Sequence, residues 1–567
     1  MKNFRWQILI AVIALVAVAL VLLSQSQVGE TITQIIEPAA QQGGVYVEGL
    51  IGEPIRFNPL LDDYNQVDQD VTRLVFSRLI RFDSWGNPQP ELAESFGVSV
   101  IGDIYNVQMR ENALWHDGTP VTTADVLFTI SLMRDGEMPV PADVRALWNS
   151  VQVTAFDALN LQFKLAEPYA PFMDYLSFGI LPKHILQDKS PQELINDPFN
   201  LLPVGSGPYQ VADLRSENGK ITAVVLEAFP DYYMGEPLIE QIVLRYFESS
   251  ADALEAYQAG EILGIGSVDP ADLEAVLAEP NLNIFSVRVP EMVMVLFNLG
   301  DDSPAFFKDT VFRQAMMTAL NRSWMIDQAM EGQAILANSP IMMGSWAYFG
   351  DTETYDFNPE EAVKMLRAGG YGLPADGSLI REKDGVRLSF DMIYTDKPEY
   401  KVVAEMIRDY WADVGVGVNI IPIPADAIYR DYLGPRNYQA ALVDLALYNS
   451  PDPDPYPFWH QAMATSGQNY SQWNDRRASE YLERARVTPD RLERARMYRN
   501  FQIHFSRELP ALPLFTKIYN YPIDQQVQGV QLGPLYDPAD RFDQVYLWSL
   551  ETRPIVEEAP QVEQGAE

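Results

Sequence analysis

A run of alternating aspartates and prolines is the densest group of polar side chains in this chain. Residues 449–455 read NSPDPDP; they follow the apolar segment 441–448 and precede Tyr456, Phe458 and Trp459. A strand that ends in an acidic, proline-stiffened loop beside aromatic rings can form the mouth of a ligand site. The same residues also favour a rigid surface turn, because Asp and Pro are common turn residues.

Motifs for catalysis and for cofactor binding are missing from the sequence. There is no cysteine, which excludes disulfides, thiolate metal sites and a catalytic thiol. The four histidines show no metal-ligand spacing, and Gly205-Ser206-Gly207 lacks the outer glycines of a nucleophile elbow. Neighbours such as His116 and Asp117 rarely converge on one proton, so we expect a structural turn there. The sequence predicts no enzyme, no cofactor and no metal site.

Charge and length narrow the possible partners and the domain count. Acidic residues outnumber basic ones 78 to 41, which gives a net charge of −37. A surface this negative repels phosphate backbones, so we expect no nucleic-acid partner. A chain of 567 residues is too long for one hydrophobic core, which predicts two or three lobes.

The first residues indicate export. Lys2 and Arg5 precede an unbroken apolar run over residues 8–23. This pattern is typical of an uncleaved membrane anchor or of a cleaved signal peptide, and we favour the anchor. Positive charge before the run predicts that the rest of the chain lies outside the cytoplasm. The protein would be anchored to the membrane if the segment is kept, and secreted or periplasmic if the segment is cleaved. Residues 28–43 are expected to form a tether, and residues 553–567 a disordered acidic tail.

The body alternates helical and strand patterns, which predicts an α/β fold. Helices are expected over 122–133, where Thr122 and Asp125 form a capping box, and over 308–322. Another is expected after Asn358, with Gly369-Gly370 as its stop. Two arginine-rich helices are expected over 475–487 and 490–507, with their charges on a solvated face.

Residues 91–130 carry the most specific pattern in the chain. They include Leu92-Ala93-Glu94-Ser95, an alternating strand over 105–110, and Trp115-His116-Asp117-Gly118-Thr119-Pro120 before a helix. This segment resembles the extracytoplasmic solute-binding proteins of peptide-type ABC importers, the dipeptide/oligopeptide/nickel-binding family 5. Further family-like blocks follow in the same order: Asn58-Pro59-Leu60, Leu181-Pro182-Lys183-His184, residues 203–209, residues 257–261, residues 312–315, residues 358–362 and Asp452-Pro453-Asp454.

The resemblance implies a hinged, two-lobed periplasmic-binding-protein-like fold with an extra subdomain inserted in the first lobe. Two hinge crossings would join the lobes, and solute would be enclosed between them. The expected parts are an anchor or signal peptide 1–27, a tether 28–43, first-lobe segments 44–82, 197–285 and 512–552, the inserted subdomain 83–196, the second lobe 286–511 and the tail 553–567.

The resemblance also implies where solute is held. Peptide binders of this family place an Asp shortly before the Asp-Pro-Asp segment, where it holds the peptide's α-amino group. Here that place falls on Asn449, or on Tyr448 if the alignment shifts. Asp452 and Asp454 are candidate substitutes, and Asn58 and Ser206 are candidate contacts from the first lobe.

We expect a monomer that captures a peptide or another small solute and delivers it to an ABC permease pair driven by cytoplasmic ATPases. The departure at Asn449 leaves an opine, a sugar or a chelated metal open as the solute. A receptor that senses solute without transport is the main alternative. An exported hydrolase that uses Asp452 and Asp454 as paired carboxylates is a further one.

Overall fold

The computed structural model describes residues 42–62, 65–447 and 450–550. The expected anchor, most of the tether, the acidic tail, Tyr448 and Asn449 therefore lie outside the described residues. Across the described part of the chain, none of the helices has the length and apolar character needed to span a membrane.

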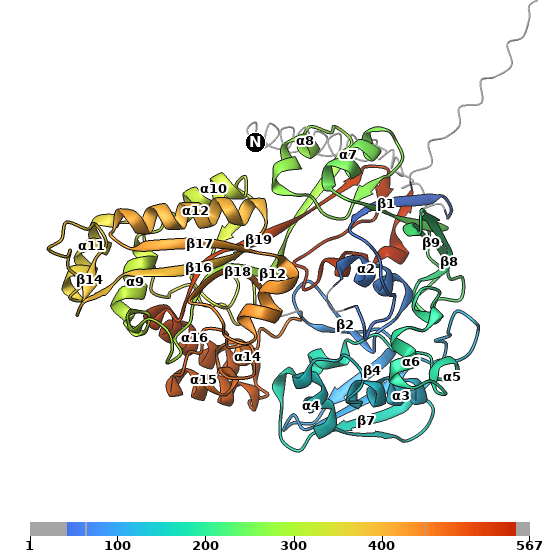
Figure 1. Cartoon of the computed structure of the whole chain (residues 1–567). Coiled ribbons are helices and arrows are strands. Elements are labelled where there is room, and N and C mark those ends of the chain that lie inside the picture. Colours follow the sequence, from blue (N-terminus) through green and yellow to red (C-terminus); the bar gives the residue numbers. More distant parts are fainter. Residues whose placement is uncertain (1–41, 63–64, 448–449, 551–567) are drawn as a thin grey trace, which may run out of the picture. The chain divides into compact units, whose positions relative to one another are not determined.

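One eleven-stranded sheet runs through the described chain (Figure 1). Its two longest strands lie side by side at the centre: β12 (Leu282–Phe297) and β19 (Ala511–Asp524) pair antiparallel. The pairing is interrupted between Arg288 and Met292. The boundary predicted at 285/286 falls inside β12, and the one predicted at 511/512 falls at the start of β19.

The central pair separates two groups of strands, so each expected lobe has its own part of the sheet. On the β12 side lie β18 (Ala440–Ala446), β16 (Ser389–Thr395) and β17 (Gly417–Ile423). On the β19 side lie β11 (Gly264–Ile265), β1 (Val45–Ile51), β10 (Gln241–Phe247), β9 (Lys220–Ala228) and β8 (Tyr209–Glu217). The short β13 (Ala334–Leu336) also pairs with β19.

The second half of β12 packs against hydrophobic side chains on both faces of the sheet. Val293, Val295 and Phe297 join one core cluster, while Met292, Met294 and Leu296 join another. This alternation is the period of two that a strand imposes, with both faces buried. A separate core cluster gathers residues from 46 to 244 and from 521 to 548. The chain therefore has several cores, as its length predicts.

The inserted subdomain has its own four-stranded sheet. Its order is β4 (Ala93–Val98), β5 (Ile104–Met109), β7 (Asn160–Lys164) and β6 (Gln152–Ala155). Two helices accompany it, α3 (Thr123–Arg134) and α4 (Ala142–Ser150). The predicted capping box at the start of α3 is confirmed: Thr122 accepts from Ala124 N, and Thr122 N donates to Asp125.

The helices predicted after Asn358 and over 475–487 and 490–507 are present, whereas one prediction fails. The expected helix 308–322 is wrong, because α9 (Thr310–Thr318) ends there and α10 (Arg322–Ala329) begins anew. The Asn321 side chain caps α10 by accepting from Trp324 N. Other helices of the described chain include α2 (Gln66–Val75), α7 (Ser250–Gln258), α8 (Leu273–Leu277), α11 (Pro359–Ala368), α12 (Pro398–Asp413), α15 (Arg476–Arg486) and α16 (Arg491–Glu508).

Candidate functional site

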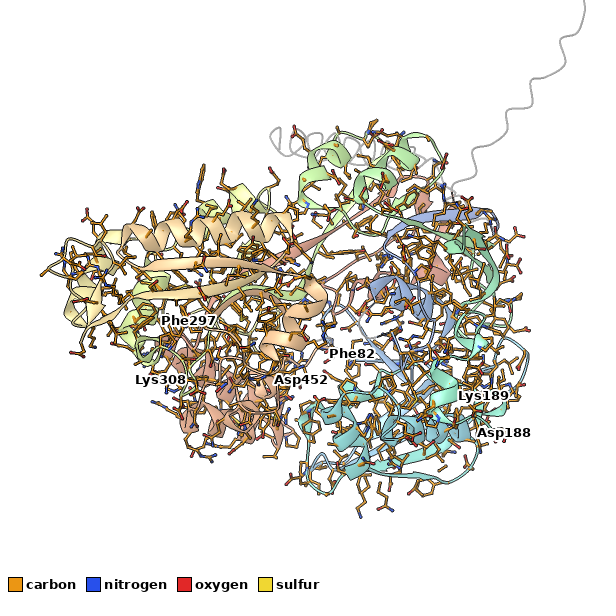
Figure 2. The ribbon with its side chains drawn as sticks, viewed as in Figure 1. Phe82, Asp188, Lys189, Phe297, Lys308 and Asp452 are labelled. Atoms are coloured by element: carbon orange, nitrogen blue, oxygen red, sulfur yellow. The ribbon has the colours of Figure 1, made fainter. Side chains whose placement is uncertain are left out.

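The loop after β18 is where the sequence predicts solute contacts, and Asp452 within it is ion-paired. Arg494 of α16 reaches both carboxylate oxygens, with Nη1 2.5 Å from Oδ2 and Nη2 2.8 Å from Oδ1. The Arg494 and Asp452 side chains are 5% and 9% exposed. The negative charge of Asp452 is therefore already compensated within the second lobe. Figure 2 shows Asp452 on the side of this lobe that faces the inserted subdomain.

Asp454 has an arginine partner as well. Arg486, the last residue of α15, donates from Nε and Nη2 to Asp454 Oδ2 at 2.9 and 2.6 Å. The guanidinium also lies over two aromatic rings, 3.7 Å from the centroid of Tyr456 and 5.4 Å from that of Tyr169. This stacking adds cation–π attraction to the ion pair. Asp454 thus fixes an arginine between rings of the second lobe and of the inserted subdomain.

These two pairs change the interpretation of the arginine-rich helices. The expectation of a solvated face is wrong for Arg494, which is 4% exposed, and Arg486 is only partly exposed. Both arginines turn inward because the acidic loop lies against α15 and α16, and an unpaired buried carboxylate is costly. The periodicity of the helices did not show this, since the partners lie more than thirty residues earlier.

The two candidates from the first lobe face its core. Asn58 is 1% exposed; its Nδ2 donates to Asn200 Oδ1 at 2.9 Å, and its Oδ1 accepts from Leu60 N at 3.0 Å. Ser206 is fully buried, and its carbonyl accepts from Ser77 Oγ at 2.9 Å. In this conformation both residues hold first-lobe loops together.

The glycines on either side of Ser206 are required by close packing. A Cβ on Gly205 would lie 1.9 Å from the carbonyl oxygen of Val75, at the end of α2. A Cβ on Gly207 would lie 2.5 Å from the carbonyl oxygen of Leu74. Only glycine lets the two backbone segments approach this closely. The Gly-Ser-Gly motif is therefore a packing element of the first lobe.

His116 joins the same turn from the inserted subdomain. Its Nδ1 accepts from Gly205 N at 3.1 Å, which leaves Nε2 to donate to the Gly207 carbonyl at 3.1 Å. Burial lowers the pKa of His116 to about 4, although the contact with Gly207 opposes that change. The imidazole is therefore a neutral brace. The expected structural turn is present, with Trp115 N bonded to Thr119 O and Gly118 at φ +84°.

A charged cluster that the sequence reasoning missed lies on the central strands, just before the loop. Lys517 of β19 lies 2.8 Å from Asp444 Oδ2 and 3.0 Å from Glu291 Oε2, and Tyr400 Oη donates to Asp444 at 2.7 Å. Burial alone would raise the pKa of Asp444, but Lys517, Lys397 and the hydrogen bonds outweigh it and lower that pKa to about 2.

The sequence does contain a signal for this cluster. Asp444 and Lys517 are the charged residues within the otherwise apolar stretches 441–448 and 511–519. A charge inside an apolar strand needs a partner of opposite sign. An ion pair between Asp444 and Lys517, had it been predicted from the sequence, would have indicated that β18 and β19 lie near each other.

A small groove opens beside the interruption in the central strand pair. It is lined by Arg288 and Pro290 of β12, by Met342 and Met343 of the second lobe, and by residues 534–536 of the last first-lobe segment. Arg288 Nη1 donates to Met343 O at 3.1 Å, and Leu535 N donates to Arg288 O at 3.0 Å. Segments from both expected lobes thus meet at this groove.

Comparison with known proteins assigns the chain to a family. The model for bacterial extracellular solute-binding proteins, family 5 Middle, matches residues 87–469, more than half of the chain. The oligopeptide-binding protein AppA of Bacillus subtilis is 26% identical, over 88% of this chain and 90% of its own. The dipeptide-binding protein of Escherichia coli is 24% identical, over 85% of this chain and 91% of its own.

A solved structure supports the same assignment. Bacillus subtilis AppA in complex with a nonapeptide superposes with a TM-score of 0.75 at 25% identity, and the match covers 91% of this chain and all of that one. At that coverage, the mixed α/β architecture is that of a two-lobed binding protein. The chain therefore belongs to the bacterial extracellular solute-binding proteins of family 5.

Proposed function

We propose that this protein captures a peptide or peptide-like solute between its two lobes and delivers it to an ABC importer. The observation that carries the proposal is the family match over residues 87–469, which spans the inserted subdomain and most of the second lobe. The proposed partners are a permease pair and its cytoplasmic ATPases. The protein acts as a monomer outside the cytoplasm.

The relatives support a peptide as the solute class. Bacillus subtilis AppA is named an oligopeptide-binding protein and the Escherichia coli relative a dipeptide-binding protein. The proposed solute contacts are those of the loop 448–454. Within it Asp452 and Asp454 are neutralised by Arg494 and Arg486, so they shape the loop rather than offer a free carboxylate. Asn58 and Ser206, which are buried in the first lobe, would act on the solute only through the first-lobe loops that they hold.

This arrangement makes Asn449 the residue that tests the class of solute. A buried ammonium needs a negative partner, and an amide offers only a neutral oxygen. A peptide with a free α-amino group should therefore gain affinity from Asn449→Asp, by about 10-fold or more for a charge-assisted hydrogen bond. A solute with no amine should lose affinity from the same change.

The experiment begins with the solute that the protein retains. Mass spectrometry of small molecules released from the purified protein names the solute, and calorimetry with that compound and with di- to nonapeptides gives affinities for the wild type and Asn449→Asp. Asp188→Asn, an exposed change in the inserted subdomain, is the control. No binding of any peptide, together with a retained compound of another class, would contradict the peptide assignment.

We also propose that residues 1–27 hold the protein at the cell membrane. The motivation is the apolar run 8–23 together with the absence of a cysteine that could carry lipid. N-terminal sequencing of the mature protein should begin at or near Met1, with the protein in the membrane fraction. A mature terminus after Gln27 and free protein in the medium would overturn this part of the proposal.

A further inference from the structure

The second lobe touches the inserted subdomain directly through a small set of contacts. The carboxylate of Asp174, in the short helix η1 (Ala170–Leu176), accepts from the backbone N of Asp452 at 2.7 Å. Nearby, Arg491 Nη1 donates to Asn87 Oδ1 at 3.5 Å. With Arg486 placed over Tyr169, these contacts join residues that are nearly 280 to more than 400 positions apart.

Asp174 is the one member of this surface whose charge is not matched by a cation of its own. Arg494, whose positive charge acts on Asp174, is paired with Asp452. Across the described residues, no lysine or arginine forms an ion pair with Asp174. Its carboxylate instead accepts hydrogen bonds from Asp452 N and from the Ser450 side chain. Asp174 and Asp452 therefore lie close together, and only Asp452 is paired with the arginine.

The other titratable groups around the contact do not supply the missing charge. Tyr105 of β5 and Tyr536 of the last first-lobe segment face Asp174 and are neutral, since burial raises the pKa of each to about 12. The charged groups that act on these two tyrosines are Asp103, Arg494 and Asp452 around Tyr105, and Arg491, Asp540 and Asp83 around Tyr536. On Asp174 itself, burial and the Asp452 charge favour the protonated form, and the Arg494 charge opposes it.

The proton affinity of Asp174 therefore depends on whether the lobes touch. In the contact, burial and then the Asp452 charge raise the pKa of Asp174 to about 7. In separated lobes the carboxyl faces water and returns to its ordinary pKa of about 4. The contact form thus binds more protons between about pH 4 and pH 7. By linkage, lowering the pH through this window favours the contact and raising the pH weakens it.

We propose that Asp174 makes the contact between the inserted subdomain and the second lobe an acid-favoured latch, which closes the lobes without solute as the pH falls. This inference rests on the two-lobe closure of the proposed function, but it concerns the empty protein. Arg486 between Tyr169 and Tyr456 supplies attraction that does not titrate in this range, and Asp174 supplies the pH dependence.

The test measures the distance between the lobes in the full chain. Because the chain has no cysteine, Lys164→Cys in β7 and Lys401→Cys in α12 give two exposed labelling sites, one in each part. Single-molecule fluorescence transfer is recorded from pH 4.5 to pH 8.5 on protein dialysed free of solute. The ratio of closed to open molecules should rise as the pH falls, by up to about tenfold per pH unit below pH 7.

Two substitutions assign the response to Asp174. Asp174→Asn keeps an acceptor for Asp452 N but cannot ionise, so the closed fraction should stay high and constant across the range. Ser450→Ala removes a hydrogen bond to the carboxylate, so the midpoint should move to higher pH. The matched control is Asp188→Asn, which makes the same charge change on the far side of the inserted subdomain (Figure 2) and should reproduce the wild-type curve. Thermal melts establish that each variant is folded.

The latch is overturned if Asp174→Asn retains the wild-type pH profile, or if closure of the wild type increases with rising pH. These outcomes are separate from failure of the proposed function. Di- to nonapeptides added at a fixed pH of 8 test that function, because any closure is then driven by the peptide alone. A protein that closes with peptide but shows no pH response would keep the function and lose the latch.

Discussion

The interior of the first lobe and the surface between the lobes each contain an arginine close to two carboxylates. The two regions differ in how completely these charges are paired. In the interior, Arg541 lies between Glu48 and Asp70 at 2.8 and 2.7 Å, and the three side chains are 1%, 0% and 3% exposed. Tyr46 and Tyr521 complete the bonding of Glu48. The cluster joins β1, α2 and the C-terminal segment within one lobe.

At the surface between the lobes, one of the carboxylates has no cation as a partner among the described residues. Asp452 has Arg494 and Asp454 has Arg486, but Asp174 faces them without a cation. Two acids bound to one arginine in the interior fix a structure, because both carboxylates reach it. Where two acids lie near one arginine and only one of them binds it, the carboxylate of the other acid can titrate. The difference shows how an ionic cluster can be permanent in one place and responsive in another.

Acid should also affect the two regions with opposite signs. His116, which braces a first-lobe turn from the inserted subdomain, is held neutral, so protons bind the unfolded chain more readily than the native one. Falling pH therefore weakens the first lobe, whereas it strengthens the contact made by Asp174. Substitutions in each region test this difference.

The largest effect is expected from Arg541→Met. The change leaves Glu48 and Asp70 buried without a cation, which should lower the free energy of unfolding by about 3–5 kcal/mol. Urea unfolding followed by tryptophan fluorescence measures it. Arg245→Met is the control, because Arg245 pairs with Glu261 at an exposed site and should cost less than about 1 kcal/mol. Equal losses in the two variants would show that the buried cluster has no special importance.

A smaller effect, visible in its pH dependence, is expected from His116→Gln. The wild type should lose about 2 kcal/mol of stability from this histidine between pH 7 and pH 5, since the unfolded pKa is about 6.5 and the folded pKa is about 4. The variant should be less stable at pH 7 by about 1–3 kcal/mol, because buried backbone groups lose a partner.

The informative measurement is the slope of unfolding free energy against pH for both proteins. The slope between pH 7 and pH 5 should be flatter in His116→Gln than in the wild type. Parallel slopes would mean that His116 has the same pKa in the native and unfolded states. That result would contradict the assignment of His116 as a buried, neutral imidazole.

The smallest effect is expected from Arg491→Ala at the surface between the lobes. Its contact with Asn87 is 3.5 Å long and exposed, so stability should change by less than about 1 kcal/mol. The pH dependence of closure should remain, because Arg491 acts on Tyr536 and not directly on Asp174. If the pH dependence of closure were lost in Arg491→Ala, the assignment of Asp174 as the titrating group would be wrong.

Local features of the fold could be predicted wherever nearby residues decide them. The capping box at Thr122, the helix after Asn358 and the two helices around Pro489 are set by contacts within a few residues. The prediction of one helix over 308–322 is wrong for a reason that is also local. Asn321 caps a second helix, and the apolar periodicity alone does not show this boundary. The tight turn after Trp115 was also foreseeable, because its residues bond to one another.

Composition and the order of motifs were enough to predict the class of this protein: a long, acidic, cysteine-free chain of several α/β lobes with the motifs of a solute-binding family. The sequence also pointed to the acidic loop, because composition and order suffice to find it. The partners of that loop could be identified only from the folded chain. Arg486 and Arg494 come from later helices and Asp174 from an earlier subdomain. Whether a carboxylate is paired, buried or free to titrate depends on such distant neighbours, because charge interactions act through space and not along the chain.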